Sequence, residues 1–299
     1  MNVLVTGGAG FIGSHFVRAA LADRLAGLEG ARVTVLDKLT YAGSFANLDE
    51  VAHDKRLDFV PGDVADTALV EVVARRHDTV VHFAAADDAV SNVLGTQVLL
   101  DAARRSGVAR FVHISTDEVY GPIATGAWTE TAALSPTTPS AATKASADLL
   151  VLAAHRTHGL PATIVRPSDT YGTHQHPRRL IPGLVTGLLT GATADLPGDG
   201  AHTRDWLHVH DLIRAVAAVV AGGRPGEVYN VGGSIELTHR ELTGLLLEEL
   251  GAGWERARYV ADHPGHDARH AVDDGKIRQE LGWRPQVEFV PGLNATVRW

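Results

Sequence analysis

The sequence predicts an α/β fold, in which a doubly wound parallel sheet carries a smaller C-terminal α/β lobe. Three observations support this prediction. An apolar strand at residues 3–6 runs directly into a glycine-rich turn and then into a helical pattern. Strand and helix patterns alternate up to about residue 165, which indicates right-handed crossovers and parallel strands. From Arg166 onward, short elements are separated by Gly/Pro turns, which is typical of an appended lobe.

The glycine turn has the spacing that a dinucleotide diphosphate needs. Gly8, Gly10 and Gly13 match G-x-G-x-x-G, and Gly7, Gly10 and Gly13 match the G-x-x-G-x-x-G spacing of short-chain dehydrogenases. Glycines let backbone N–H groups approach phosphates, and the following helix N-terminus supplies partial positive charge. Residues 1–165 are therefore interpreted as a Rossmann-type NAD-binding core to which later segments return, and residues 166–299 mainly as an interleaved substrate-binding lobe.

The elements expected in the core follow from apolar periodicity. A helix is expected from Phe11 to about Leu25, and further strands and helices at 33–37, 57–64, 79–83, 92–105, 110–114 and 140–158. An acid that ends the second strand, Asp37, can bond a ribose hydroxyl and favours NAD over NADP; a plain strand-end residue or helix cap is the alternative. Asp63 lies where such folds commonly bind the adenine amino group.

Small residues after the fourth strand would let the backbone lie against the cofactor. Together with Lys144, discussed below, the predicted cofactor contacts are Gly7, Gly10, Phe11, Ile12, Gly13, Asp37, Lys38, Asp63, Val64, Phe83, Ala84 and Ala85.

Composition excludes several classes of protein. The 299 residues carry a net charge of −8, which disfavours a nucleic-acid or anionic membrane surface. The chain contains no cysteine, so disulfides and thiolate metal sites are excluded. No apolar run approaches the ~20 residues that cross a bilayer. We therefore expect a cytoplasmic protein with no nucleic-acid or membrane partner.

Two stretches carry reactive side chains. Thr116, Asp117 and Glu118 follow the fifth strand, where adjacent carboxyls allow one acid and one base if their surroundings separate the pKa values. Pro139 marks the start of a helix that places Lys144 one turn in. Lys144 could bond the nicotinamide ribose and lower the pKa of a neighbouring proton acceptor; an exposed helix lysine is the alternative.

With these motifs, the chain resembles the dTDP-glucose 4,6-dehydratase family of extended short-chain dehydrogenase/reductases. The matching segments are residues 6–13, 36–43, 115–121, 204–209, 229–233 and 265–267. The resemblance implies oxidation of the sugar at C4, water loss across C5 and C6 with Glu118 as base and Asp117 as acid, and reduction at C6. It implies that Thr116 bonds the C4 oxygen and Arg204 the diphosphate, while Asn230 and His266 lie on the nucleotide side or serve structural roles.

The chain departs from the family pattern at three places. Ser140 stands where the Tyr-x-x-x-Lys motif has its tyrosine, and a serine hydroxyl is shorter and less acidic than a phenol. The loop at 85–91 is short for the family. Asp169, counted among the substrate contacts, and Thr170 replace an Asn-Asn pair, which brings an acid towards the substrate phosphates unless Asp169 is paired or turned away.

These departures leave several interpretations open. The chain is a homologue with altered or lost chemistry, its tyrosine was replaced and its loop trimmed deliberately, or it turns over slowly with water or Ser140 relaying the proton. A sugar-nucleotide epimerase or ketoreductase and a non-catalytic nucleotide-sugar binding protein are the alternative functions. No metal is expected despite His-x-His pairs at 174–176 and 208–210. The helices 92–105 and 140–158 match those that form a four-helix dimer interface in the family, so a homodimer is expected.

Overall fold

The computed structural model describes residues 1–233, 235–262 and 267–299. Its main sheet has seven strands in the order β10-β6-β5-β4-β1-β2-β3, and every neighbouring pair is parallel. The strands are β1 (Asn2–Thr6), β2 (Arg32–Asp37), β3 (Leu57–Pro61), β4 (Thr79–His82), β5 (Arg110–Ile114), β6 (Ala162–Pro167) and β10 (Val228–Val231). The predicted doubly wound sheet is confirmed. Its order reverses between β1 and β4, where ligands bind in such folds.

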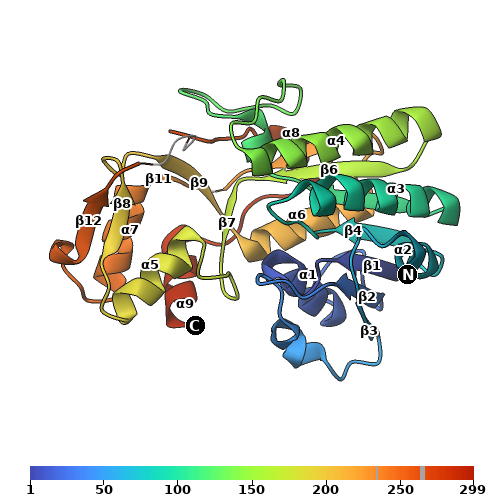
Figure 1. Cartoon of the computed structure of the whole chain (residues 1–299), viewed down its shortest axis with the longest axis horizontal. Helices are drawn as coiled ribbons and strands as arrows, with labels where there is room; N and C mark the ends of the chain where they lie inside the picture. The colour runs from blue at the N-terminus through green and yellow to red at the C-terminus, as the bar shows by residue number, and fades with distance from the viewer. Residues whose placement is uncertain (234, 263–266) are drawn as a thin grey trace.

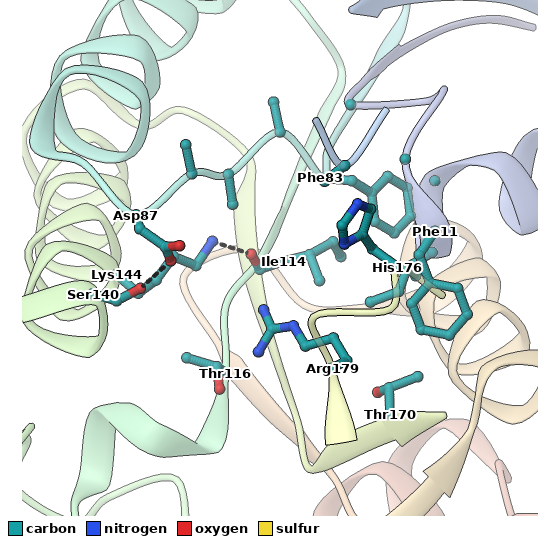
Figure 2. A pocket seen from close by; sticks show the side chains of 18 of the residues that line it. Phe11, Phe83, Asp87, Ile114, Thr116, Ser140, Lys144, Thr170, His176 and Arg179 are labelled. Carbon is teal, nitrogen blue, oxygen red and sulfur yellow. Dashed lines mark hydrogen bonds between the residues drawn. The ribbon is translucent and has the colours of Figure 1, made fainter. Parts of the chain in front are cut away.

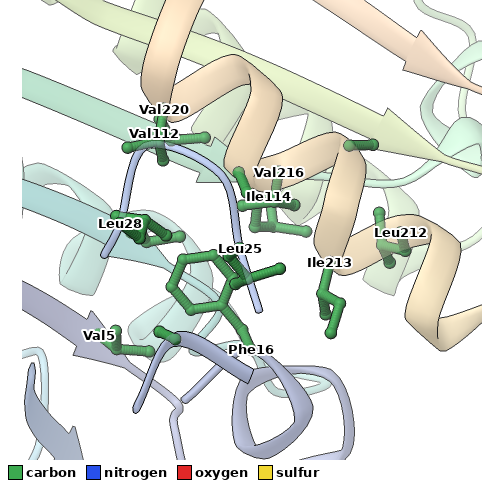
Figure 3. Close-up of a cluster of buried hydrophobic side chains, with 14 of the residues drawn as sticks. Val5, Phe16, Leu25, Leu28, Val112, Ile114, Leu212, Ile213, Val216 and Val220 are labelled. Carbon is green, nitrogen blue, oxygen red and sulfur yellow. The ribbon is translucent and has the colours of Figure 1, made fainter. Parts of the chain in front are cut away.

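Helices cover both faces of this sheet (Figure 1). One face carries α1 (Phe11–Leu21), α6 (Val209–Gly222) and α8 (Gly275–Leu281), and the other carries α2 (Thr67–Ala74), α3 (Gly95–Ser106) and α4 (Pro139–His158). Figure 3 shows the first interface, where Phe16 of α1 and Val216 of α6 pack beside Ile114 of β5. This burial fixes α1, and with it the glycine turn, against the strand ends.

The second lobe is built from smaller sheets with their own apolar cluster (Figure 1). Its strands are β7 (Asp169–Tyr171), β9 (Thr203–His208) and β11 (Ile235–Thr238) in one sheet, and β8 (Ala194–Pro197) with β12 (Ala257–Val260) in another. Its helices are α5 (Leu180–Leu189), α7 (His239–Glu249) and α9 (Phe289–Arg298). Short helical turns occur at η1 (Phe45–Val51), η2 (Val90–Leu94), η3 (Asp117–Tyr120) and η4 (Trp254–Arg256).

Strand β6 crosses residue 166, and β10 and α6 return from the later sequence to the main sheet. In the described ranges, none of the helices combines the length and apolarity needed to span a membrane. The cytoplasmic location stays a prediction.

Two expected helix boundaries were wrong. The first helix ends at Leu21 rather than near Leu25, because Asp23 adopts a left-handed backbone (φ 54°) and the Arg56 guanidinium donates to the Leu21 carbonyl. The helix expected from residue 92 begins as an α-helix only at Gly95, after the π-helical turn η2.

Asp211, near the start of α6, does not cap that helix. Helix α6 begins at Val209, and the side chain of His208 accepts the cap hydrogen bond from the His210 N–H. Asp211 is 1% exposed, and its two carboxylate oxygens accept the backbone N–H groups of Gln286 and Val287, both at 3.0 Å. Asp211 therefore anchors the C-terminal segment to α6.

Replacing Asp205 of β9 by Asn is expected to stabilise the protein above neutral pH. Burial raises the pKa of Asp205 to about 7, so the folded protein keeps a proton that the unfolded chain loses near pH 4, and the free energy of unfolding falls as pH rises between these values. An amide can still accept the 2.8 Å hydrogen bond from Gly233 N–H. We expect D205N to gain up to about 4 kcal/mol at pH 8 and little at pH 4.

Denaturant unfolding at both pH values measures this effect. The exposed pair of Asp195 with Arg258 offers a control, because D195N should change stability by less than about 1 kcal/mol. An equal effect of D205N at both pH values would contradict the assignment.

Candidate active site

One cavity of about 850 Å³ runs along the carboxyl ends of the central strands and reaches the second lobe. It is lined by the glycine turn, the ends of β2, β4 and β5, the start of α4, and residues of β7, β9 and the loop before α5. The predicted site residues on its wall are Gly7, Gly10, Phe11, Ile12, Gly13, Asp37, Lys38, Asp63, Val64, Phe83, Ala84, Ala85, Thr116, Asp117, Glu118, Ser140, Lys144, Asp169 and Arg204. The fold thus brings both predicted groups, cofactor and catalytic, to one cavity.

The glycine turn is too tightly packed for side chains. A Cβ on Gly13 would lie 2.2 Å from the Gly7 carbonyl oxygen, and a Cβ on Gly7, whose φ is +70°, would lie 2.6 Å from the Ala84 nitrogen. The first-turn N–H groups of α1 have no acceptor within the helix. No acidic residue competes for them in that turn, which lies wholly in the described part of the chain. This cradle fits a dinucleotide diphosphate.

Replacing Gly13 by Ala is expected to abolish tight binding of NAD. The added methyl must displace the Gly7 carbonyl and open the turn, because backbone cannot yield as a side-chain tip can. Calorimetric titration with NAD should show affinity lower by at least about 10²-fold, a factor that corresponds to about 3 kcal/mol. The control is G30A: Gly30 lies in a surface turn with nothing within 4 Å of its Cβ position, so a small stability loss without loss of NAD affinity is expected. Unchanged NAD affinity in G13A would contradict this reading of the turn.

Asp37 joins the end of β2 to the glycine turn. Its Oδ2 accepts the Ala9 N–H at 3.0 Å and its Oδ1 accepts the Leu39 N–H at 2.8 Å. A carboxylate has about four acceptor sites, so capacity remains for ribose hydroxyls. Nearby, Lys38 Nζ lies 3.1 Å from Asp63 Oδ2, which places the predicted adenine contact beside the predicted ribose contact.

The adjacent carboxyls lie in the turn η3. Thr116 is the N-cap of this turn, and its hydroxyl accepts the Glu118 N–H at 3.3 Å. Burial, followed by the negative charges of Asp169 and Glu118, raises the pKa of Asp117 well above its ordinary value. Burial and Asp169 also raise the pKa of Glu118, while Arg179 and Arg204 oppose that rise. The pair can therefore hold a proton on Asp117 beside a strengthened base on Glu118.

Lys144 and Ser140 lie one turn apart at the start of α4 (Figure 2). The α4 N-terminus is capped by Thr138, whose side chain accepts the Ala141 N–H, and Pro139 occupies the first turn. Lys144 Nζ donates to the Ile114 carbonyl at 2.5 Å, and burial lowers its pKa to about 8. Lys144 is therefore held at the end of β5 rather than on the exposed helix face.

Asp169 and Asn230, two predicted substrate contacts, both make hydrogen bonds or ion pairs within the protein. Asp169 is paired, because its Oδ2 lies 3.2 Å from Arg204 Nε, so the acid does not confront the substrate phosphates alone. For Asn230 the contacts favour the structural alternative over the nucleotide contact. Its side chain is 0% exposed and lies off the cavity, accepting from the Tyr120 hydroxyl at 2.8 Å and donating to the Trp128 carbonyl at 2.9 Å.

The expected contact at His266 lies outside the described residues. So does His263, another histidine of the C-terminal segment.

Sequence reasoning missed three charged residues that line the cavity, Asp87, Arg178 and Arg179; Figure 2 labels Asp87 and Arg179. Asp87 lies in the short loop after β4, and its Oδ1 accepts a hydrogen bond from the Ser140 hydroxyl at 3.2 Å. Arg179 directly precedes α5. The signals were present in the sequence: an acidic pair in the shortened loop, and a basic pair after the His-x-His run.

The histidines outside the cavity mainly pack against one another. His15 has ring centroids 5.3 Å from both His174 and His210, and burial lowers the pKa of His15 to about 3. Across the ranges that the structure describes, three or more His, Cys, Asp or Glu side chains never gather as a metal ion requires.

Comparison with known proteins agrees with this geometry. The family model described as GDP-mannose 4,6 dehydratase matches residues 4–296. A dTDP-glucose 4,6-dehydratase of Streptomyces niveus is 50% identical over 310 residues, covering 100% of this chain and 92% of that protein.

Two solved structures represent the dehydratase and epimerase activities. DesIV of Streptomyces venezuelae, a dTDP-glucose 4,6-dehydratase solved with NAD bound, has a TM-score of 0.98 and 53% identity, covering 100% of this chain and 96% of its own. A UDP-glucuronic acid 4-epimerase of Bacillus cereus, solved with UDP-glucuronic acid and NAD, has a TM-score of 0.92 but 27% identity, with coverage of 100% and 98%. The fold is common to both activities, whereas the sequence is nearer to the dehydratase.

Proposed function

The chain belongs to the dTDP-glucose 4,6-dehydratase family, and from this premise we propose that it converts dTDP-glucose, or a closely related dTDP-hexose, to the 4-keto-6-deoxy sugar nucleotide with NAD, as a step of deoxysugar biosynthesis. The observation that carries the proposal is that Asp117, which is buried, and Glu118, which is half-buried, line the same cavity as the glycine turn. An epimerase has no use for two carboxyls there.

The residues of the chain divide the work as follows. NAD supplies the hydride acceptor and donor. Thr116 bonds the C4 oxygen, and oxidation at C4 comes first because a 4-ketone acidifies the C5 proton. Glu118 takes that proton, and Asp117, whose pKa burial raises, protonates the departing C6 hydroxyl. Lys144 bonds the nicotinamide ribose, and Arg204 and Arg179 offer positive charge to the diphosphate, where a guanidinium fork suits phosphate oxygens.

Incubation with dTDP-glucose and NAD, followed by mass spectrometry, tests the proposal. We expect a product lighter by one water. An isomer of unchanged mass would indicate the epimerase. Binding of both ligands without turnover would indicate a non-catalytic nucleotide-sugar binding protein, for which Ser140 is the best argument.

Membership of this family also bears on the oligomeric state of the protein. The apolar side chains Val90, Leu94 and Leu149 are 55%, 50% and 58% exposed at η2 and α4. The many alanines of α4 permit close helix packing, so a homodimer through α3 and α4 is proposed. Sedimentation analysis of L149E should then give a monomer where the unsubstituted chain gives a dimer.

A further inference from the structure

We propose that Asp87 is a catalytic residue that accepts the proton of the sugar hydroxyl oxidised at C4, in place of the tyrosine that this chain lacks. The inference rests on the proposed function, since it assigns the base of its first step. It concerns the loop between β4 and η2, residues 83–89, which the chain keeps short.

Both oxygens of Asp87 are held by hydroxyl groups of the cavity wall. Ser140 Oγ donates to Oδ1 at 3.2 Å, and the Tyr41 hydroxyl donates to Oδ2 at 3.4 Å. All three residues line the cavity together with Thr116 and Lys144. In Figure 2, Asp87 lies over the first turn of α4 beside Ser140 and Lys144. A carboxylate thus lies next to Ser140, the position that the tyrosine of a Tyr-x-x-x-Lys motif would occupy.

The backbone next to Asp87 is held by the buried side-chain amide of Asn92. Asn92, 2% exposed, accepts the Ala86 N–H at 3.0 Å and donates to the Ala86 carbonyl at 2.5 Å. Its amide also donates to Thr143 Oγ1 at 2.8 Å, and Thr143 in turn donates to the Ser140 carbonyl at 2.7 Å. Asn92 therefore ties the loop to the first turn of α4 and sets the place of Asp87. It is a positioning residue.

The chemistry of the step balances. The C4 hydroxyl loses its proton to a carboxylate oxygen of Asp87, and the O–H electron pair becomes the second C–O bond. The C4–H pair leaves as hydride to the oxidised nicotinamide, which the proposed function supplies. Asp117 gives a proton to the departing hydroxyl and ends the cycle deprotonated, whereas Asp87 ends it protonated. The one proton that Asp87 gains therefore balances the one that Asp117 must regain. The hydrogen bonds from the Ser140 and Tyr41 hydroxyls stabilise the negative charge of Asp87 between turnovers.

The test is the kinetic behaviour of D87N with dTDP-glucose and with the same substrate deuterated at C4. We expect kcat to fall by about 10²–10⁴-fold, the usual cost of a lost general base. KM and the calorimetric affinities for NAD and dTDP should stay within about twofold of the unsubstituted enzyme, because binding groups are untouched. The isotope effect on kcat should rise, since C4 oxidation becomes rate-limiting. D87E should restore part of the rate.

The matched control is D88N on the same loop. Asp88 accepts the Ser91 N–H at 2.6 Å and lies off the cavity wall, and asparagine also serves at helix starts. D88N should keep kcat and the isotope effect. A D87N enzyme with unchanged kcat overturns the inference. A fall in kcat that comes with a raised KM or weakened NAD binding and an unchanged isotope effect also overturns it. That pattern would mean that Asp87 only maintains the structure of the loop. If the unsubstituted enzyme releases no water from dTDP-glucose, the proposed function itself fails.

Discussion

Replacing Glu118 by Gln should greatly slow water loss from the sugar while leaving oxidation at C4 in place. The amide cannot take the C5 proton, so dehydration is expected to slow by about 10²–10⁴-fold. Burial raises the pKa of Glu118, which strengthens it as a base in its ionised form. The same rise means that dehydration by the unsubstituted enzyme should fall as pH drops through that raised pKa. Mass spectrometry of the sugar nucleotide measures both the 4-keto sugar and the dehydrated product.

Exchange of the C5 proton with deuterated water distinguishes the role of Glu118 as base from that of Asp117 as acid. E118Q should lose this exchange, because no base reaches C5. D117N should keep the exchange and still fail to release water, because only the acid is missing. Deuterium uptake at C5 by E118Q, at the rate of the unsubstituted enzyme, would show that another group is the base.

Replacing Ser140 by Tyr should raise the rate of C4 oxidation by about 10²-fold. The phenol would stand one helical turn before Lys144, and an ammonium group lowers the pKa of a neighbouring phenol towards neutrality. Because burial lowers the pKa of Lys144 to about 8, the gain should shrink above that pH as the ammonium loses its charge. Stopped-flow measurement of C4 oxidation across pH gives both quantities.

The double variant S140Y/D87N is the sharper control. A phenol in place should make Asp87 dispensable, so the double variant should oxidise C4 about as fast as S140Y alone. S140F adds the bulk without the hydroxyl and should show no gain. If S140Y itself brings no gain, then the shortened loop at 85–91 limits the rate rather than the missing phenol.

Local patterns predicted most of the core. The apolar run before Gly7, the glycine spacing and the Pro139 helix start are signals carried by near neighbours in sequence, and the structure has β1, the turn and α4 where they indicate. Helix ends were less accurate. The end of α1 depends on Arg56, which is distant in sequence and donates to the last turn.

Asn230 and Asp211 show why roles are harder to predict than elements. Both are polar residues at element boundaries, which is also where ligand contacts and caps occur. Only the packing of other segments, Tyr120 and Trp128 on Asn230 and residues 286–287 on Asp211, turns them into interior anchors.

The sequence by itself determined the parallel sheet, the dinucleotide turn and the identity of the reactive side chains, because each is written in spacing along one short stretch. Tertiary structure alone decided that Asp169 is neutralised by Arg204, that Lys144 is buried at the end of β5, and that Asp87 meets Ser140. Those pairings join segments that are far apart in the chain. The lowered pKa of Lys144 follows from its burial, which no local pattern encodes.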